Sequence, residues 1–192
     1  MKDVGIIVAA TTNGGIGYKN SLPWHIPEEL KLFRKITTTV ENDKKCNCII
    51  MGKNTWHSIP KKPLKNRVNI IITSNEYEKM KKKVDNDDNI IVVRDLHDAI
   101  NHLNRTDCIE NGFIIGGAQL YNDCLEKNLD KIKYVYMSLI FDKNYECDKF
   151  IETRLIYDNF IINKDDVITT DKYISMKGIN KRFPVIIDEP PD

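Results

Sequence analysis

The sequence predicts an α/β fold: a mainly parallel central sheet with flanking helices and an antiparallel C-terminal edge. Two observations predict it. Short apolar runs rich in β-branched residues alternate with helical segments, which is typical of a parallel sheet covered on both faces. The C-terminal part shows apolar runs without helices between them, which favours antiparallel strands. A chain of 192 residues is long enough for one domain with a sizeable core.

Most of the chain shows the alternation clearly. Residues 4–10 form a continuous apolar run, typical of a buried strand, and the turn-rich segment 11–22 follows. Pro27 suits the first position of a helix, where its missing N–H is not needed. The elements expected in order are strand 4–10, helix 27–40, strand 47–51, helical turn 52–59, strands 68–73 and 90–93, helix 96–104, strand 113–115, helix 118–126 and strand 134–141.

The remaining segments are expected to be late strands, surface loops and a tail. The late strands are expected over 157–163, 172–177 and 183–187. Polar, charged stretches over 76–88 and 142–149 predict surface loops. No domain boundary is evident, so we expect a single domain over 1–187 with a frayed tail over 188–192.

Composition excludes several function classes. The formal net charge of +1 gives no sign of a nucleic-acid partner, and no apolar run approaches the ~18 residues of a membrane span. The start of the chain lacks a signal-peptide layout. The 5 cysteines show no zinc spacing, and their odd number favours reduced thiols. We therefore expect a cytoplasmic protein without a metal site.

A carboxylate on the apolar face of the first expected helix is the main candidate for chemistry. At about 100° per residue, Glu29 falls within the arc of Leu32, Phe33 and Ile36, while Glu28 lies at its edge. Both acids favour a helix N-terminus, which explains Glu28 fully. A buried carboxylate needs a partner or a raised pKa, and such groups cluster in functional sites. Two interpretations stay open: a helix-start acid, or a group that binds a protonated or amidine-like heterocycle.

Glycines and arginines at strand ends are weaker candidates. Gly116-Gly117 lies between a strand and a helix, where backbone amides can meet a phosphate or simply form a tight turn. The glycines after the first strand do not form a dinucleotide fingerprint, and Gly52-Lys53-Asn54-Thr55 lacks the earlier glycine of a nucleotide triphosphatase loop. Arg67 and Arg94 flank strands and are either anion ligands or surface residues.

Taken together, these segments resemble dihydrofolate reductase of the eukaryotic type, from Gly5 to about Ile187. One motif alone is weak, but the whole set in this order and spacing is highly specific. The blocks are Ile7-Val8-Ala9-Ala10, Gly15-Ile16-Gly17, Leu22-Pro23-Trp24, Phe33-Arg34-Lys35-Ile36-Thr37, Met51-Gly52-Lys53-Asn54-Thr55-Trp56, Ser58-Ile59-Pro60, Pro63-Leu64-Lys65-Asn66-Arg67 and Ile115-Gly116-Gly117.

The resemblance implies a reaction and its catalytic residues. Hydride would pass from C4 of NADPH to C6 of 7,8-dihydrofolate, and N5 would gain a proton. Glu29 matches the family's single active-site acid, which would bind the pterin amidine edge and favour N5 protonation through an ordered water. Trp24 would help to hold that water. Ser138 replaces a threonine found in most relatives, keeps the hydroxyl and would support the Glu29 carboxylate.

The resemblance also implies two sets of binding residues. The folate pocket would be lined by Val8, Ala9, Leu30, Phe33, Ser58, Ile59, Leu64, Ile114 and Tyr121, with Arg67 on the glutamate α-carboxylate. The cofactor would contact Ala9, Ile16, Gly17, Gly52, Lys53, Asn54, Thr55, Thr73, Ser74, Arg94, Gly116, Gly117, Ala118, Gln119, Leu120 and Tyr121.

Further expectations concern the cofactor. Segment 11–22 would be a mobile loop that closes over the nicotinamide and excludes water. Gly116-Gly117 would carry the family's cis peptide. Asn54 stands where relatives usually carry a basic residue, which makes the 2′-phosphate site less positive. Lys53 and Arg94 remain there, so the resemblance favours NADPH over NADH.

Alternatives and partners complete the prediction. One alternative is a reductase on the same fold that acts on a pyrimidine-like riboflavin precursor, but Glu29 together with Arg67 suits a pterin with a glutamate tail. Another is a non-catalytic ligand-binding or RNA-associating domain, and near-neutral charge disfavours RNA. Expected partners are dihydrofolate and antifolate inhibitors. Because some members of the family are fused to thymidylate synthase, fusion to or association with that enzyme is a further expectation.

Overall fold

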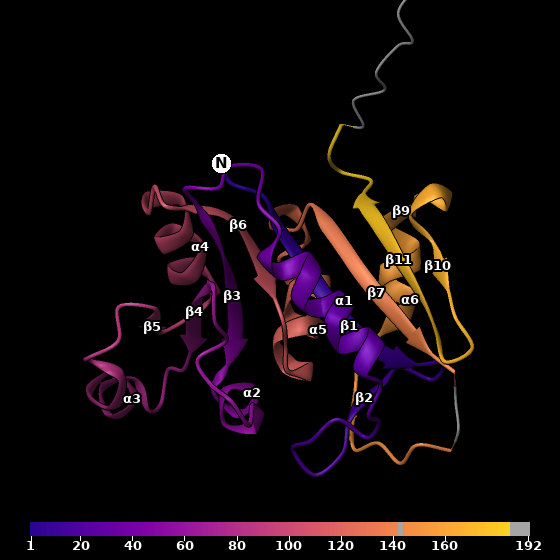
Figure 1. Ribbon diagram of the computed structural model, residues 1–192, viewed down its shortest axis with the longest axis horizontal. Coiled ribbons are helices and arrows are strands. Elements are labelled where there is room, and N and C mark those ends of the chain that lie inside the picture. The colour runs from indigo at the N-terminus through magenta and orange to yellow at the C-terminus, as the bar shows by residue number, and fades with distance from the viewer. Residues whose placement is uncertain (142–143, 185–192) are drawn as a thin grey trace, which may run out of the picture.

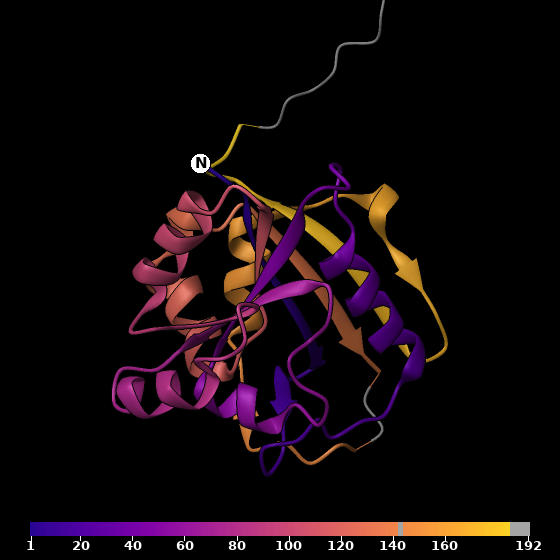
Figure 2. The same ribbon diagram turned by 60° about the vertical axis from the view of Figure 1, so that its left-hand side comes forward.

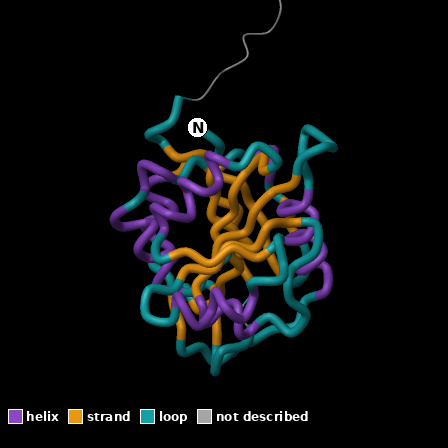
Figure 3. Tube along the Cα trace, turned by 90° about the vertical axis from the view of Figure 1, so that its left-hand side faces the viewer, coloured by secondary structure: helices purple, strands orange, loops and turns teal. Residues whose placement is uncertain are grey.

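One large twisted sheet lies between two layers of helices in the computed structural model, which describes residues 1–141 and 144–184 (Figures 1 and 3). The described strands of this nine-stranded sheet run in the order β10-β11-β7-β1-β6-β3-β4-β5, and β9 also pairs with β11. Their bounds are β1 Val4–Thr11, β3 Cys46–Gly52, β4 Arg67–Ile72, β5 Ile90–Val93, β6 Ile109–Ile114, β7 Tyr134–Ile140, β9 Phe160–Ile162, β10 Ile168–Thr169 and β11 Tyr173–Asn180.

The sheet confirms the predicted mixture of strand directions. From β5 to β7 all neighbours are parallel, whereas β9, β10 and β7 each pair antiparallel with β11. Because parallel strands end at the same edge, β1, β3, β4, β5 and β6 bring their carboxyl ends together at the lower end in Figure 1. The site is built at that edge, the usual place for a ligand in α/β folds.

The helices divide between the two faces of the sheet, as Figure 2 shows. Alternate residues of each strand point to opposite faces, so Ile50 packs with the residues of one face and Ile49 with those of the other. Helices α4, α5 and α6 contribute to the first core, and α1, α2 and α3 to the second. Their bounds are α1 Pro27–Thr38, α2 Lys53–Ser58, α3 Tyr77–Val84, α4 Leu96–Arg105, α5 Ala118–Lys127 and α6 Thr153–Asn159.

Local chemistry explains where α1 begins and ends. Pro27 occupies its first turn and Glu28 and Glu29 follow, which suits the positive end of a helix. At the other end, the hydroxyls of Thr37, Thr38 and Thr39 donate to main-chain carbonyls four residues earlier, at 2.8, 2.8 and 2.7 Å. The Thr39 N–H also donates to the Lys35 carbonyl, and the helix ends at Thr38, two residues before the predicted end.

Two helical segments were predicted as other structures. Residues 77–84, expected to be a loop, form α3, because Tyr77, Met80 and Val84 lie at helical spacing and contact the core while the lysines face solvent. Residues 157–159, expected to begin a strand, end α6, where Ile156 is fully buried. In so short a segment the periods of helix and strand cannot be told apart. Of the strand expected over 183–187, Phe183 and Pro184 are in no strand, and residues 185–187 lie outside the described residues, as does the tail 188–192.

A small hairpin follows β1. Strand β2 (Gly15–Gly17) pairs antiparallel with β8 (Lys149–Phe150). Neither strand was predicted, because the segments 11–22 and 142–149 were expected to be a turn-rich stretch and a surface loop. Beyond β2 the chain turns at Lys19 and Asn20, which have φ values of 48° and 60°, and a bridge joins Tyr18 to Ser21. The segment 11–22 is therefore a structured turn beside the carboxyl ends of the strands. In the described part of the chain, no helix is long and apolar enough to cross a membrane.

Candidate active site

A cleft of ≈ 680 Å³ opens at the carboxyl ends of the parallel strands. Its walls come from the end of β1, the β2 turn, and the segments that follow β3, β4, β5 and β6. Of the residues predicted to bind cofactor, all except Gly116 line this one cleft: Ala9, Ile16, Gly17, Gly52, Lys53, Asn54, Thr55, Thr73, Ser74, Arg94, Gly117, Ala118, Gln119, Leu120 and Tyr121. The fold thus gathers residues that are far apart in the sequence.

Gly116 and Gly117 follow β6 at the edge of the sheet where the cleft opens, and Gly117 lines the cleft. The peptide bond between them is cis, as the resemblance implied. Gly116 has a φ of 104°, and a Cβ atom there would lie 2.7 Å from the Tyr121 ring, so no other residue fits. Its carbonyl accepts a hydrogen bond of 2.8 Å from the Gly52 N–H, which joins the ends of β6 and β3. Helix α5 begins directly after Gly117, so its positive end faces the cleft.

Glu29 is buried, as helix periodicity predicted, with 7% of its surface exposed. Burial raises the pKa of its carboxyl group above the ordinary value, and hydrogen bonding with the Ser138 side chain acts in the opposite direction. Ser138 on β7 pairs with Ala9 on β1, and Ala9 lines the cleft. The carboxyl group of α1 therefore lies beside the strand that borders the cofactor cleft.

Tyr121 and Trp24 are two buried aromatic residues among those predicted for the site. Tyr121 is fully enclosed, its hydroxyl donates to the Ile7 carbonyl at 2.7 Å, and burial followed by the charge of Glu29 raises its pKa. Trp24 is buried too, with its ring 5.7 Å from that of Tyr145. Its indole Nε1 has no hydrogen-bond partner among the described residues. A buried donor of this kind normally needs an acceptor, and an ordered water can provide one.

Arg67, at the start of β4, is also buried, with 6% of its surface exposed. Its guanidinium donates to the Thr37 hydroxyl at 2.7 Å and to the Lys65 carbonyl at 3.1 Å, and lies 5.9 Å from the Phe33 ring. No carboxylate among the described residues pairs with it. Burial, followed by the nearby Arg34, lowers its pKa.

The residues predicted for the folate pocket fall into three groups. Val8, Ala9, Ser58 and Tyr121 line the cleft itself. Phe33, Ile59 and Leu64 each pack against the core on the α1 face of the sheet, and Leu30 on α1 is 41% exposed. Ile114 was a wrong assignment: it is fully buried in the opposite core, and its neighbour Ile115 lines the cleft. The alternation of a strand explains the shift by one residue.

Sequence reasoning missed several residues of the cleft. They are Asn20, Ser21, Leu22, Ile72, Asn75, Ile115, Asp123 and Lys149. Ile72, Asn75 and Ile115 each adjoin a predicted residue, so continuing those motifs by one position would have found them. Lys149 is different, because it reaches the cleft only through the pairing of β8 with β2, which no local pattern indicates. Among the described residues, no group of His, Cys, Asp and Glu side chains could hold a metal ion.

This fold and cleft are typical of an α/β enzyme that binds its ligands at the carboxyl ends of the parallel strands, with a buried carboxylate beside the cleft. The family model for dihydrofolate reductase matches residues 3–178. The chain therefore belongs to the dihydrofolate reductase family, whose members reduce dihydrofolate.

Individual relatives agree with the family. A dihydrofolate reductase of Aedes albopictus is 33% identical over 176 residues, which cover 87% of this chain and 88% of the relative. One of Pneumocystis carinii is 37% identical and covers 78% and 73% of the two chains. A bifunctional dihydrofolate reductase-thymidylate synthase of Daucus carota is 34% identical over 76% of this chain, which spans 27% of that longer protein.

Proposed function

We propose that the chain converts 7,8-dihydrofolate to tetrahydrofolate with NADPH, and that Glu29 and an ordered water assist protonation of N5. When bound, the cofactor supplies the hydride that C6 of the pterin accepts. The residues of the chain bind and orient both molecules, exclude water and direct a proton. The observation that carries this proposal is the buried Glu29 carboxyl group, which lies beside the cofactor cleft and has no cation paired with it among the described residues.

Glu29 suits the amidine edge of a pterin. A carboxylate accepts two hydrogen bonds in the geometry that a ring N–H and an exocyclic NH₂ present. Because burial raises the pKa of Glu29, a hydrogen-bond donor is needed to stabilise the ionised carboxylate. Ser138 supplies one donor and leaves capacity for the pterin. Glu29 acts here as an anchor that favours the protonated heterocycle.

A water beside Trp24 would carry the proton to N5. The unpartnered Nε1 of Trp24 supports this step, because a buried donor can fix the oxygen of one water molecule. That water would lie between the indole and the Glu29 carboxyl group. General acid–base assistance of this kind typically contributes a factor of roughly 10²–10⁴ to the rate.

Arg67 would bind the α-carboxylate of the glutamate tail. Its guanidinium is buried and oriented by Thr37, and no acid among the described residues neutralises it, which supports an incoming carboxylate as its partner. A guanidinium and a carboxylate form two parallel hydrogen bonds. Phe33, Ile59, Leu64 and the exposed Leu30 would contact the apolar part of the substrate between pterin and tail.

The cleft has the groups that a phosphorylated dinucleotide requires. The segment from Gly117 to Leu120 would hold the pyrophosphate against the amino end of α5. Lys53 and Arg94, with Thr73 and Ser74, lie at the far end of the cleft and would contact the 2′-phosphate. Ile16 and Gly17 on β2 would cover the nicotinamide and exclude water.

A substrate panel tests the proposal. Purified protein should oxidise NADPH only when dihydrofolate is present, should use NADH less efficiently, and should ignore a pyrimidine-like riboflavin precursor. An antifolate should compete with dihydrofolate. Turnover of the pyrimidine alone would support the other reductase, and tight antifolate binding without any turnover would support a binding protein. Either result would overturn the proposed activity.

A further inference from the structure

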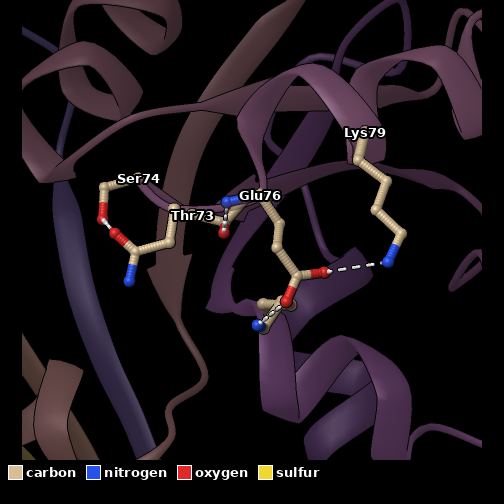
Figure 4. Close-up of polar contacts among 6 residues, drawn as sticks. Thr73, Ser74, Glu76 and Lys79 are labelled. Atoms are coloured by element: carbon tan, nitrogen blue, oxygen red, sulfur yellow. Dashed lines mark hydrogen bonds and ion pairs between the residues drawn. The ribbon is translucent and has the colours of Figure 1, made fainter.

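Lys53 and Arg94, the two cationic side chains proposed to contact the 2′-phosphate of the cofactor, each contact an acidic residue at the start of α3. Lys53 Nζ contacts Glu76 Oε1, and Arg94 NH2 lies 3.0 Å from Glu78 Oε1. Glu76 immediately precedes α3 and Glu78 lies in its first turn. Figure 4 shows the Glu76 carboxylate reaching from the segment of Thr73 and Ser74 toward the amine below it. These cations therefore have competing partners before any phosphate arrives.

Glu76 is the N-terminal cap residue of α3, where its carbonyl accepts from the Met80 N–H, but its carboxylate takes no part in the cap. Its N–H donates to the Thr73 hydroxyl at 3.4 Å, and its side chain makes no capping hydrogen bond to α3. One carboxylate oxygen contacts Lys53 and the other lies 4.0 Å from Lys79. Hydrogen bonding with Lys53, together with that amine's charge, lowers the pKa of Glu76, so the carboxylate is ionised at neutral pH. Removing the charge should leave the start of the helix intact.

The two ion pairs differ in strength. The Lys53 and Glu76 side chains are 28% and 38% exposed, whereas those of Arg94 and Glu78 are 54% and 73% exposed. Exposed pairs contribute little because water and salt screen them. Arg94 also stacks on the Tyr77 ring at 4.1 Å, which holds its guanidinium without Glu78. Competition for a cation is therefore concentrated on Glu76 and Lys53.

We propose that Glu76 is a specificity-determining residue, which reduces the preference for a 2′-phosphorylated cofactor by competing for Lys53. This inference rests on the proposed use of NADPH. A 2′-phosphate carries a charge near −2 at neutral pH. To bind it, Lys53 must either break its contact with the Glu76 carboxylate or keep that contact and hold two negative groups close together. Both arrangements weaken binding of the phosphorylated dinucleotide. Neither arrangement affects a dinucleotide with a free 2′-hydroxyl. Glu76 therefore reduces the difference in affinity between the phosphorylated and the unphosphorylated dinucleotide.

Direct binding measurements test this inference without turnover. Isothermal titration of wild type and Glu76→Gln with NADP⁺ and NAD⁺ gives the two dissociation constants. We expect Glu76→Gln to bind NADP⁺ about fivefold more tightly, the upper end for a partly exposed ion pair, and NAD⁺ within about twofold of wild type. Glu41→Gln is the matched control, since it removes the same charge at an exposed position that does not line the cleft.

A double-mutant cycle assigns the effect to Lys53. In a Lys53→Gln background, Glu76→Gln should change NADP⁺ affinity by less than about twofold, because the contested amine is absent. The inference would be overturned if Glu76→Gln left the ratio of NADP⁺ to NAD⁺ affinity unchanged. It would also be overturned if Glu76→Gln raised NADP⁺ affinity equally in the Lys53→Gln background. Failure of wild type to bind NADP⁺ at all would instead contradict the proposed cofactor. The two failures are therefore distinguishable.

Discussion

At the scale of single residues, Glu29 is the group on which the proposed reaction depends, and Ser138 is its hydrogen-bond partner. Helix periodicity placed Glu29 in the apolar arc, and the structure buries it there. Periodicity could not name its partner, because Ser138 lies on β7, more than 100 residues away, and approaches only through the pairing of β7 with β1. The resemblance supplied that pairing. Ile114 shows how a resemblance can slip by one position in a strand, where one step reverses the face.

The raised pKa of Glu29 makes a prediction about the unliganded protein. Below the ordinary value of 4.5 both the folded and unfolded states hold the proton. As pH rises, the unfolded chain releases it first, so wild type loses stability through the window between 4.5 and the raised folded pKa. We expect Glu29→Gln to have a higher Tm than wild type near neutral pH, and the difference to vanish near pH 4.

Thermal unfolding across pH gives this comparison, with Glu28→Gln as the control. Glu28 is exposed, and main-chain hydrogen bonding lowers its pKa, so its replacement should not raise the Tm at any pH. A lower Tm for Glu29→Gln at neutral pH would contradict the claim that the ionised carboxylate is destabilising where it is buried.

Among the elements, α1 depends on one fully buried amide. The Asn47 side chain donates to the carbonyls of Thr37 and Thr39, at 3.3 and 2.7 Å, and accepts from the Asn111 N–H at 3.1 Å. It thereby joins the end of α1 to β3 and β6. Thr37 in turn accepts from Arg67, so the same contact fixes the guanidinium proposed to bind the substrate tail.

Replacing this amide should weaken the protein as a whole. Asn47→Ala leaves the buried Thr37 carbonyl and the partly buried Thr39 carbonyl and Asn111 N–H without this partner, which we expect to lower the free energy of unfolding by about 3 kcal/mol. Urea unfolding measures it. Asn42→Ala is a suitable comparison, because Asn42 is exposed and its side chain accepts only from the nearby Lys44 N–H. Equal stabilities of the two variants would refute the structural role of Asn47.

Elements with strong periodicity were predictable and short ones were not. Helices α1, α4 and α5 matched the sequence expectation to within a few residues, because each presents a continuous apolar stripe. Helix α3 hides a single fully buried residue, Met80, among lysines, so its segment was interpreted as a loop. Helix α6 is too short for its period to show.

At the scale of the whole molecule, topology creates the site. Alternating strands and helices predicted parallel pairing, and parallel pairing brings the strand ends to one edge. That geometry explains why residues from Ala9 to Tyr121 line one cleft. The contribution of Lys149 depends on the β2–β8 hairpin, and that of Glu76 on a charge pair across two elements. Neither contact follows from local sequence, because each depends on tertiary position.

The central claim is that one buried carboxylate governs the reaction, and turnover of dihydrofolate tests it most directly. We would compare steady-state NADPH oxidation near neutral pH by wild type, Glu29→Gln and Glu28→Gln. Glu29→Gln should keep its fold and lose about 100-fold or more of kcat, while Glu28→Gln should stay within about twofold of wild type. Undiminished turnover by a folded Glu29→Gln variant would contradict the account.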